Sequence, residues 1–123
     1  MDKTPGIFSW NELMTRDAAA SAKFYTELFG WSREEMDMQG YPYSMFKSGD
    51  RVVCGMFTLP PDAESMPDMW MPYVTVEDLE ASVARAKDLG ATVHKEITTI
   101  QVGRFAILAD PQGAVIGLWQ FTS

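Results

Sequence analysis

The feature that most constrains how this chain folds is an internal repeat, in which two similar segments lie about sixty residues apart. The segments are RDAAASAKFYTELFG (16–30) and EDLEASVARAKDLG (77–90). The second residue of each is an aspartate suited to the N-cap of a helix, Asp17 or Asp78, and the last is a glycine suited to the position just past a helix end. Because self-similarity of this kind marks repeated units of structure, we expect two copies of one motif, each with one helix.

Strand-like runs surround each helix in the same order. One run precedes the helix, a second follows it, and two more form a hairpin at the end of each half. We expect strands in the first half at 7–15, at 30–38 and in the hairpin 43–57, and in the second half at 69–76, at 90–99 and in the hairpin 103–119. The second hairpin turn, Asp110-Pro111-Gln112-Gly113, fits a type I turn. Each half is therefore predicted to be a βαβββ module.

These modules predict one domain of the α+β class. The first module covers about residues 5–57 and the second about 69–121, and the segment 58–68 between them, rich in proline and acidic residues, is expected to be a linker. Aligning the last strands of the modules pairs Gly55 with Gly117. A glycine inside a strand weakens it and often marks the close approach of another group, so this pair indicates a special site.

Charge and composition exclude several classes of function. Ten Lys and Arg against 17 Asp and Glu give a net charge of −7, with no basic cluster, so we expect neither nucleic acid nor anionic membrane as a partner. No apolar run approaches the ~20 residues that span a bilayer, and the first residues lack the layout of a signal peptide. We therefore expect a cytoplasmic protein. The single cysteine, Cys54, is expected to be a small buried hydrophobic residue rather than a nucleophile.

Each predicted helix carries apolar side chains at spacings that place them on one face. Such a stripe is typical of core packing, and we expect it to be buried. The residues are Phe24, Tyr25, Leu28 and Phe29 in the first helix, and Leu79, Val83, Ala86 and Leu89 in the second.

The most specific features of the sequence are three motifs, D-x3-S-x2-FY-x3-FGW (17–31), V-x-D-x3-S (76–82) and F-x3-ADPQG-x3-GLW (105–119). Together they resemble the vicinal oxygen chelate superfamily, which includes glyoxalase I, bleomycin-resistance proteins, fosfomycin-resistance enzymes and extradiol dioxygenases. The resemblance implies the glyoxalase/bleomycin-resistance fold, in which two tandem βαβββ modules form an incomplete eight-stranded barrel around a cavity.

In metal-dependent members, as the resemblance implies, side chains of the first and last strand of each module hold the ion. Those positions here are Trp10, Gly55, Met71 and Gly117. A divalent ion needs imidazole, carboxylate or thiolate donors, and an indole, a thioether and two glycines supply at most one weak donor. We therefore predict that the usual metal is absent and that no other cofactor is bound. The one histidine, His94, is expected to be structural or to face solvent.

Residues two apart along a strand share a face, so the four positions define a candidate lining for the cavity. The lining is mostly apolar and aromatic, as in small-molecule pockets, and the two glycines remove volume from it. The alternative is that these side chains simply fill the interior, as in many small barrels. The predicted ligand-binding residues are Phe8, Trp10, Glu12, Val53, Gly55, Phe57, Met71, Tyr73, Thr75, Arg104, Val115, Gly117 and Trp119.

Glu12 is the most informative member of this lining. A carboxylate that faces an aromatic cavity has its charged form disfavoured, which suits a general acid or base. The alternative is a structural ion pair, for which Arg104 is the nearest candidate. Tyr41, Tyr43, Met69, Trp70 and the linker are expected at the mouth of the cavity.

The sequence leaves three hypotheses for function. The first is a metal-independent protein that binds an apolar or aromatic small molecule in the cavity. The second is an enzyme of glyoxalase, lyase or dioxygenase type, with a displaced metal site or with Glu12 as catalytic acid or base. The third is a structural or interaction module with a filled cavity. From the resemblance we also expect a homodimer, formed with or without exchange of modules between the chains.

Overall fold

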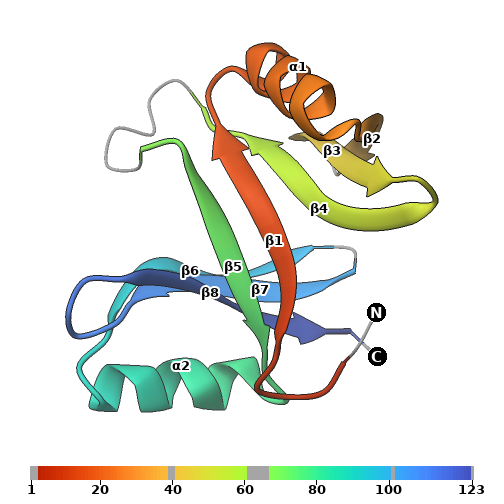
Figure 1. Ribbon diagram of the computed structural model, residues 1–123. Helices are drawn as coiled ribbons and strands as arrows, with labels where there is room; N and C mark the ends of the chain where they lie inside the picture. The colour runs from red at the N-terminus through yellow and green to blue at the C-terminus, as the bar shows by residue number, and fades with distance from the viewer. Residues whose placement is uncertain (1–2, 39–40, 61–66, 101, 123) are drawn as a thin grey trace. The chain divides into compact units, whose positions relative to one another are not determined.

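The computed structural model describes residues 3–38, 41–60, 67–100 and 102–122, and these follow two successive βαβββ patterns (Figure 1). The pattern predicted from the repeat is therefore confirmed. No helix within the described ranges has the length and apolarity needed to cross a membrane. The elements are β1 (Phe8–Thr15), α1 (Ala18–Phe29), β2 (Ser32–Met38), β3 (Tyr41–Ser48), β4 (Arg51–Thr58), β5 (Met69–Thr75), α2 (Leu79–Asp88), β6 (Thr92–Ile100), β7 (Gly103–Ala109) and β8 (Val115–Phe121).

The two patterns share one strand order. The first runs β2-β3-β4-β1 and the second β6-β7-β8-β5 across the sheet. In each, the first and last strands of the module pair in parallel, β1 with β4 and β5 with β8. The remaining neighbours pair antiparallel. Identical topology in both halves is what a duplicated βαβββ unit produces.

The chain divides into two compact units, which are described separately. One is Trp10–Trp70, and the other combines Met1–Ser9 with Met71–Ser123. The segment before Trp10 is tied to the second unit by backbone hydrogen bonds: Gly6 N donates to Thr75 O at 2.8 Å, and Thr75 N donates to Ile7 O at 2.9 Å. The first unit therefore contains α1 and β2–β4, and the second contains α2 and β5–β8.

Both helices begin where the sequence predicts. The Asp17 carboxylate accepts from Ala20 N at 3.0 Å, and the Asp78 carboxylate accepts from Ala81 N at 3.1 Å. Each contact satisfies one of the backbone donors that the first turn of a helix leaves unpaired. Gly30 ends α1 in the left-handed conformation, with φ of 73°, which a residue with a side chain adopts at a cost.

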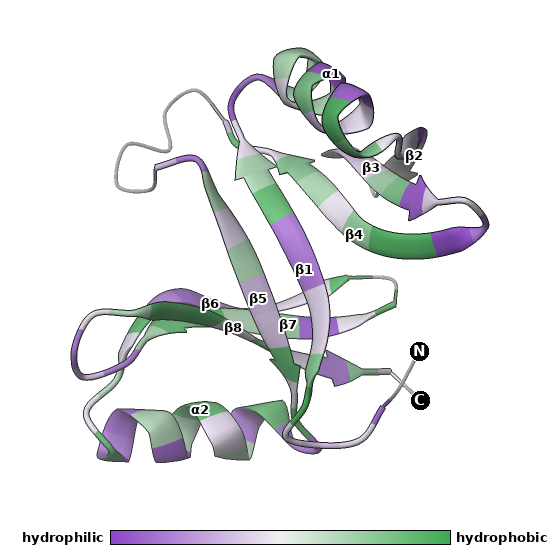
Figure 2. Ribbon diagram, viewed as in Figure 1, coloured by the Kyte–Doolittle hydropathy of each residue, from purple (hydrophilic) through white to green (hydrophobic). Residues whose placement is uncertain are grey.

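The predicted buried stripe of α1 is wrong for Phe24, Leu28 and Phe29, whereas Tyr25 packs against the core as predicted. Phe24, Leu28 and Phe29 are 56–58% exposed, and in α2 Leu89 is 60% exposed. The face of α1 that packs on the sheet is instead the smaller one, formed by Ala18, Ala22 and Tyr25 at positions i, i+4 and i+7. In α2, Leu79 and Val83 are buried as predicted. Figure 2 shows that hydrophobic and hydrophilic residues alternate along both helices.

The two hairpins differ in regularity. The β7–β8 turn closes with Gly113 N donating to Asp110 O at 2.9 Å, and its register runs without a shift. In β3–β4, Lys47 pairs with Val52 but Phe46 pairs with Cys54, which leaves Val53 as an extra residue. This is a β-bulge, and it changes which side chains of β3 and β4 share a face.

Candidate functional site

The sheet of the second unit presents most of its predicted lining on the face away from α2. Leu118 packs with Leu79 and Val83 beneath the helix. Because side chains alternate along a strand, Gly117 and Trp119 face the other way. Trp119 pairs with Phe105, whose ring lies 6.2 Å from that of Tyr73 in an edge-on contact. These side chains form an aromatic surface on the helix-free face.

The sheet of the first unit carries the acidic part of the predicted lining. Glu12 pairs directly with Gly55, on neighbouring parallel strands, and both Glu12 and Phe57 are half-buried. Val53 departs from the prediction, because as the extra residue of the bulge it packs against the helix-side core cluster that contains Cys54. The alternation rule therefore holds for Gly55 and Phe57 but breaks at Val53.

A chain of hydrogen bonds links three side chains beside Gly55. The indole Nε1 of Trp10 donates to the Tyr43 hydroxyl at 3.1 Å, and that hydroxyl is hydrogen-bonded to the Glu12 carboxylate. An indole N–H only donates and a carboxylate only accepts, so the direction is fixed: Trp10 donates to Tyr43, and Tyr43 donates to Glu12. Sequence reasoning identified Trp10 and Glu12 but placed Tyr43 at the mouth.

Tyr43 keeps its proton across the ordinary pH range. Burial raises the pKa of its hydroxyl far above the usual value, the charge of Glu12 raises it further, and the hydrogen bond from Trp10 offsets only part of this. The hydroxyl is therefore always able to donate to the carboxylate. Its ring is buried, being only 9% exposed, so the donor is held in place.

Tyrosine rings cover both glycines of the repeat. A methyl group on Gly55 would overlap the hydroxyl of Tyr43 and lie 3.0 Å from the Trp10 ring. A methyl group on Gly117 would overlap the ring of Tyr73, its direct partner on β5. The expectation that the two glycines leave space for a ligand is therefore wrong. In each unit a tyrosine of the same unit occupies the space in front of the glycine.

The remaining predicted residues differ in environment. Met71 and Thr75 are buried, and Thr75 Oγ1 makes no hydrogen bond within the described part of the chain. Phe8 is 65% exposed, and Val115 is half-buried. Arg104, the predicted ion-pair candidate for Glu12, pairs with Glu80 of α2, at 2.6 Å between Nη1 and Oε1.

The residues expected at the mouth of the cavity do not act as one group. Tyr43 lies over Gly55 as described above, and Met69 is half-buried. Trp70 packs on α1, where its Nε1 donates to the Tyr25 hydroxyl at 3.1 Å. The side chain of Tyr41 and the linker residues 61–66 lie outside the described residues.

A divalent metal does not fit the four positions at which the family resemblance implies ligands. The donors there are an indole and a thioether, and both glycine positions are covered by phenol rings. Within the described residues no three His, Cys, Asp or Glu side chains come together as a metal-binding group. His94 is exposed, and Cys54 is buried, which raises the pKa of its thiol to about 11. The chemistry of these residues supports hydrogen bonding and aromatic contact instead.

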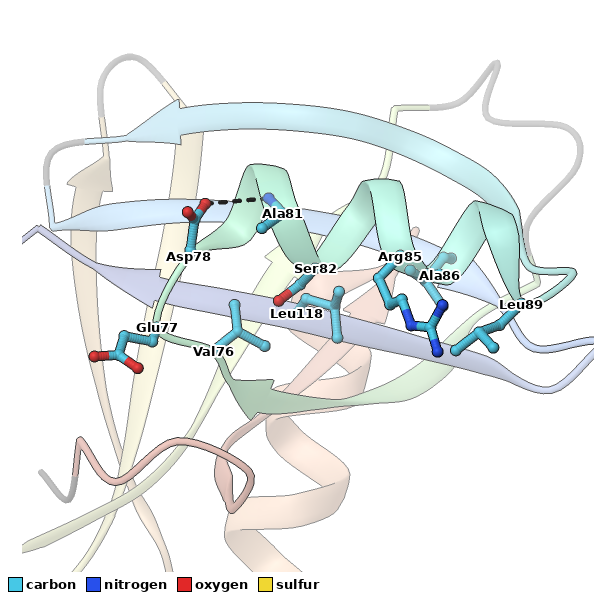
Figure 3. Close-up of a pocket in the computed structure, with 10 residues that line it drawn as sticks. Val76, Glu77, Asp78, Ala81, Ser82, Arg85, Ala86, Leu89 and Leu118 are labelled. Carbon is cyan, nitrogen blue, oxygen red and sulfur yellow. Dashed lines mark hydrogen bonds between the residues drawn. The ribbon is translucent and has the colours of Figure 1, made fainter.

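A separate groove of about 510 Å³ lies along α2 in the second unit (Figure 3). Leu118 forms part of its floor, and Arg85 and Leu89 line it from the helix. Since Leu118 and Gly117 point to opposite faces of β8, the groove and the predicted lining lie on opposite sides of this sheet.

Solved structures of other proteins superimpose on nearly the whole of this chain. A methylmalonyl-CoA epimerase of Streptomyces coelicolor in complex with 2-nitronate-propionyl-CoA superimposes with a TM-score of 0.65 at 16% identity, covering 98% of this chain and 100% of the other. A hypothetical protein of Bacillus halodurans gives 0.67 at 12% identity, covering 98% and 97%. At such identities the likeness establishes the fold, which is the one predicted from the sequence.

The family follows from the sequence matches. The model of the Glyoxalase/Bleomycin resistance protein/Dioxygenase superfamily matches residues 7–118. The chain belongs to this superfamily. It is 37% identical over 119 residues to the "Putative glyoxylase CFP32" of Mycobacterium bovis, and 31% identical over 130 residues to the "Anthracycline biosynthesis protein DnrV" of Streptomyces peucetius. These matches cover 94% of this chain but only 46% and 47% of the relatives, so the chain spans about half their length.

Proposed function

We propose that this protein binds an apolar or aromatic small molecule on the helix-free faces of its sheets, without a divalent metal. One observation carries the proposal: the four positions where metal-dependent relatives are expected to hold an ion provide an indole, a thioether and two glycines covered by Tyr43 and Tyr73. Aromatic rings and a few fixed polar groups are what small-molecule sites are made of. The buried hydroxyl of Thr75 adds a polar group to this lining.

The similarity to a protein named for anthracycline biosynthesis supports an aromatic ligand. Anthracyclines are planar polycyclic molecules, and the rings of Trp10, Phe105 and Trp119 offer faces and edges against which such molecules stack. The proposal concerns this domain, which corresponds in length to about half of that relative.

The metal-free part of the proposal is tested by dialysis of the purified protein against Ni²⁺, Zn²⁺, Mn²⁺ and Fe²⁺, followed by measurement of bound metal. We expect less than stoichiometric binding for every ion. A Cys54→Ser variant is the matched control, because it separates binding by the thiol from binding by other groups. One ion per chain, retained in that variant, would overturn the proposal.

The ligand-binding part is tested by a structure of protein purified from cells, inspected for a bound organic molecule. A molecule against Trp10 or Tyr73 is the expected result. If both sheet faces are filled by the protein's own side chains alone, the third hypothesis, a structural module, is correct.

A second candidate function is catalysis with Glu12 as general acid or base. The hydrogen bond from Tyr43 favours it, because a positioned carboxylate is the first requirement of such catalysis, and a relative bears the name glyoxylase. Turnover of a small carbonyl compound such as methylglyoxal should fall about 100-fold or more in Glu12→Gln, as for removal of a general base. Unchanged turnover in the variant would exclude this role.

We also propose a cytoplasmic homodimer. The exposed apolar side chains of α1, Phe24, Leu28 and Phe29, support it, since contiguous exposed apolar surface marks interaction sites. Light scattering after gel filtration should give twice the monomer mass. Leu28→Glu places a charge in the apolar surface, so the measured mass of this variant should fall toward that of a monomer. Lys23→Gln, on the same helix, is the control. A monomer at all concentrations would contradict this proposal, and cell fractionation tests the location.

A further inference from the structure

The Glu12 carboxylate and its neighbours restrict the chemistry of a ligand that binds here. Glu12, Trp10, Tyr43 and Gly55 all belong to the first unit, so their arrangement is internal to one compact body. Glu12 is half-buried and pairs with Gly55, its carboxylate is hydrogen-bonded to the Tyr43 hydroxyl, and the rings of Tyr43 and Trp10 lie over Gly55. A planar ring packed against these side chains therefore brings its substituents close to Glu12.

An ionised carboxylate accepts hydrogen bonds and donates none. A ligand group that faces Glu12 is stabilised if it is an O–H or N–H donor, and it is repelled if it is itself a carboxylate or another anion. The net charge of −7 over the chain also disfavours the binding of anions.

Tyr43 determines where the carboxylate points. Its hydroxyl accepts from Trp10 and donates to Glu12, so its two strongest bonding directions are used by protein groups. A chain of this kind is strengthened by mutual polarisation, and it keeps the carboxylate in one orientation. Gly55 makes the arrangement sterically feasible, because any side chain there would displace the hydroxyl.

We propose that the first unit binds a neutral aromatic molecule bearing a hydroxyl or N–H group that donates to Glu12, and that Tyr43 is the positioning residue for this carboxylate. The inference rests on the proposed function and adds the class of ligand to it. The raised pKa of Tyr43 agrees with it, since the phenol then remains protonated, and so a donor, at neutral pH.

The test compares three probes that share one ring system, 2-naphthol, 2-methoxynaphthalene and 2-naphthoate, by isothermal titration calorimetry on the full chain. Naphthol carries a donor, the methyl ether carries none, and naphthoate is an anion. We expect naphthol to bind at least about tenfold more tightly than the ether, since about tenfold is the lower end of what one hydrogen bond to a charged group contributes. Naphthoate is expected to bind most weakly.

Two variants identify the groups responsible. Tyr43→Phe removes the hydroxyl and keeps the ring over Gly55, and Glu12→Gln removes the charge and keeps the phenol. In both, the tenfold preference for naphthol over its ether should fall to threefold or less. A variant whose site is only destabilised loses affinity for both probes alike. The ratio of the affinities for naphthol and its ether therefore distinguishes a positioning role from a loss of structure. Tyr25→Phe is the matched control, because Tyr25 also accepts from a tryptophan at 3.1 Å but lies on α1.

The outcomes distinguish this inference from the proposed function. If naphthol and its ether bind equally to the unchanged protein, or if the preference survives both Tyr43→Phe and Glu12→Gln, the donor-selective site is refuted while the binding function stands. If no probe binds at millimolar concentration, the proposed function fails and the inference with it. A preference lost in Tyr43→Phe and Glu12→Gln and retained in Tyr25→Phe supports both.

Discussion

Replacing Gly55 with alanine tests the close packing on which the candidate site depends. The new methyl group would overlap the Tyr43 hydroxyl, so the phenol has to leave its position between Trp10 and Glu12. The loss of the neutral hydrogen bond from Trp10 costs about 1 kcal/mol, and that of the bond to the carboxylate about 2 kcal/mol. Alanine regains about 0.5–1 kcal/mol over glycine in a strand. The net destabilisation is therefore about 2 kcal/mol.

A second background isolates the cause of this loss. In Tyr43→Val the side chain is too short to reach Gly55, so Gly55→Ala meets only the edge of the Trp10 ring. There the alanine should be neutral or stabilising by up to about 1 kcal/mol. The coupling energy between positions 43 and 55 is then about 2–3 kcal/mol, within the range measured for residues in direct contact.

The assay is urea denaturation, followed by tryptophan fluorescence and by far-ultraviolet circular dichroism. If the two probes give coincident transitions, unfolding is two-state, and the free energies of unfolding can be compared between variants. If Gly55→Ala costs the same in both backgrounds, Tyr43 does not occupy the space in front of Gly55, and the interpretation of the site is wrong.

Three further predictions concern single groups. Burial raises the pKa of the Cys54 thiol from 9.0 to about 11. The contribution of this thiol to stability is therefore present below pH 9 and lost as the pH rises toward 11. Fast modification of Cys54 by a disulfide reagent at pH 8 in the folded protein would contradict its burial. Partial desolvation raises the pKa of Asp68, but the hydrogen bonds and charge of Arg16 outweigh it and hold the pKa below 3.8. The stability that Asp68 provides is therefore lost as the pH falls below that value, and Asp68→Asn should be less sensitive to acid than the unchanged protein in denaturation between pH 5 and 2. Asp17→Ala should destabilise the protein by about 1 kcal/mol and Asp17→Asn by much less, in urea denaturation; equal losses would exclude the N-cap bond.

The fold could be predicted because its signals are local. The caps at Asp17 and Asp78 depend on contacts within three residues, and the Asp110–Gly113 turn on four consecutive residues. A repeat of these signals at a fixed spacing predicts two like modules, and both modules have the same strand order. Burial was harder to predict. On α1 the spacing of Phe24 and Leu28 is that of a buried face, but a smaller face of the helix packs on the sheet.

The candidate site was predicted in part. Alternation along strands predicted Glu12 and Gly55 on one face, and the structure pairs them directly on β1 and β4, but alternation did not reveal Tyr43 over Gly55. A regular hairpin counted back from the Ser48–Arg51 pair sets Tyr43 opposite Met56, on the helix side of the sheet. The bulge shifts the pairing by one residue and sets Tyr43 opposite Phe57, on the face of Gly55.

The sequence alone therefore determined the duplicated modules, the ends of both helices and the special position of Gly55 and Gly117. The tertiary structure decided what those glycines contact, which is Tyr43 in one unit and Tyr73 in the other. It also decided that Arg104 forms an ion pair with Glu80, rather than belonging to the predicted lining. The physical reason is that caps and turns arise from neighbours in the chain, whereas a shared face or an ion pair depends on the register between distant segments, where a shift of one residue reverses the direction of a side chain.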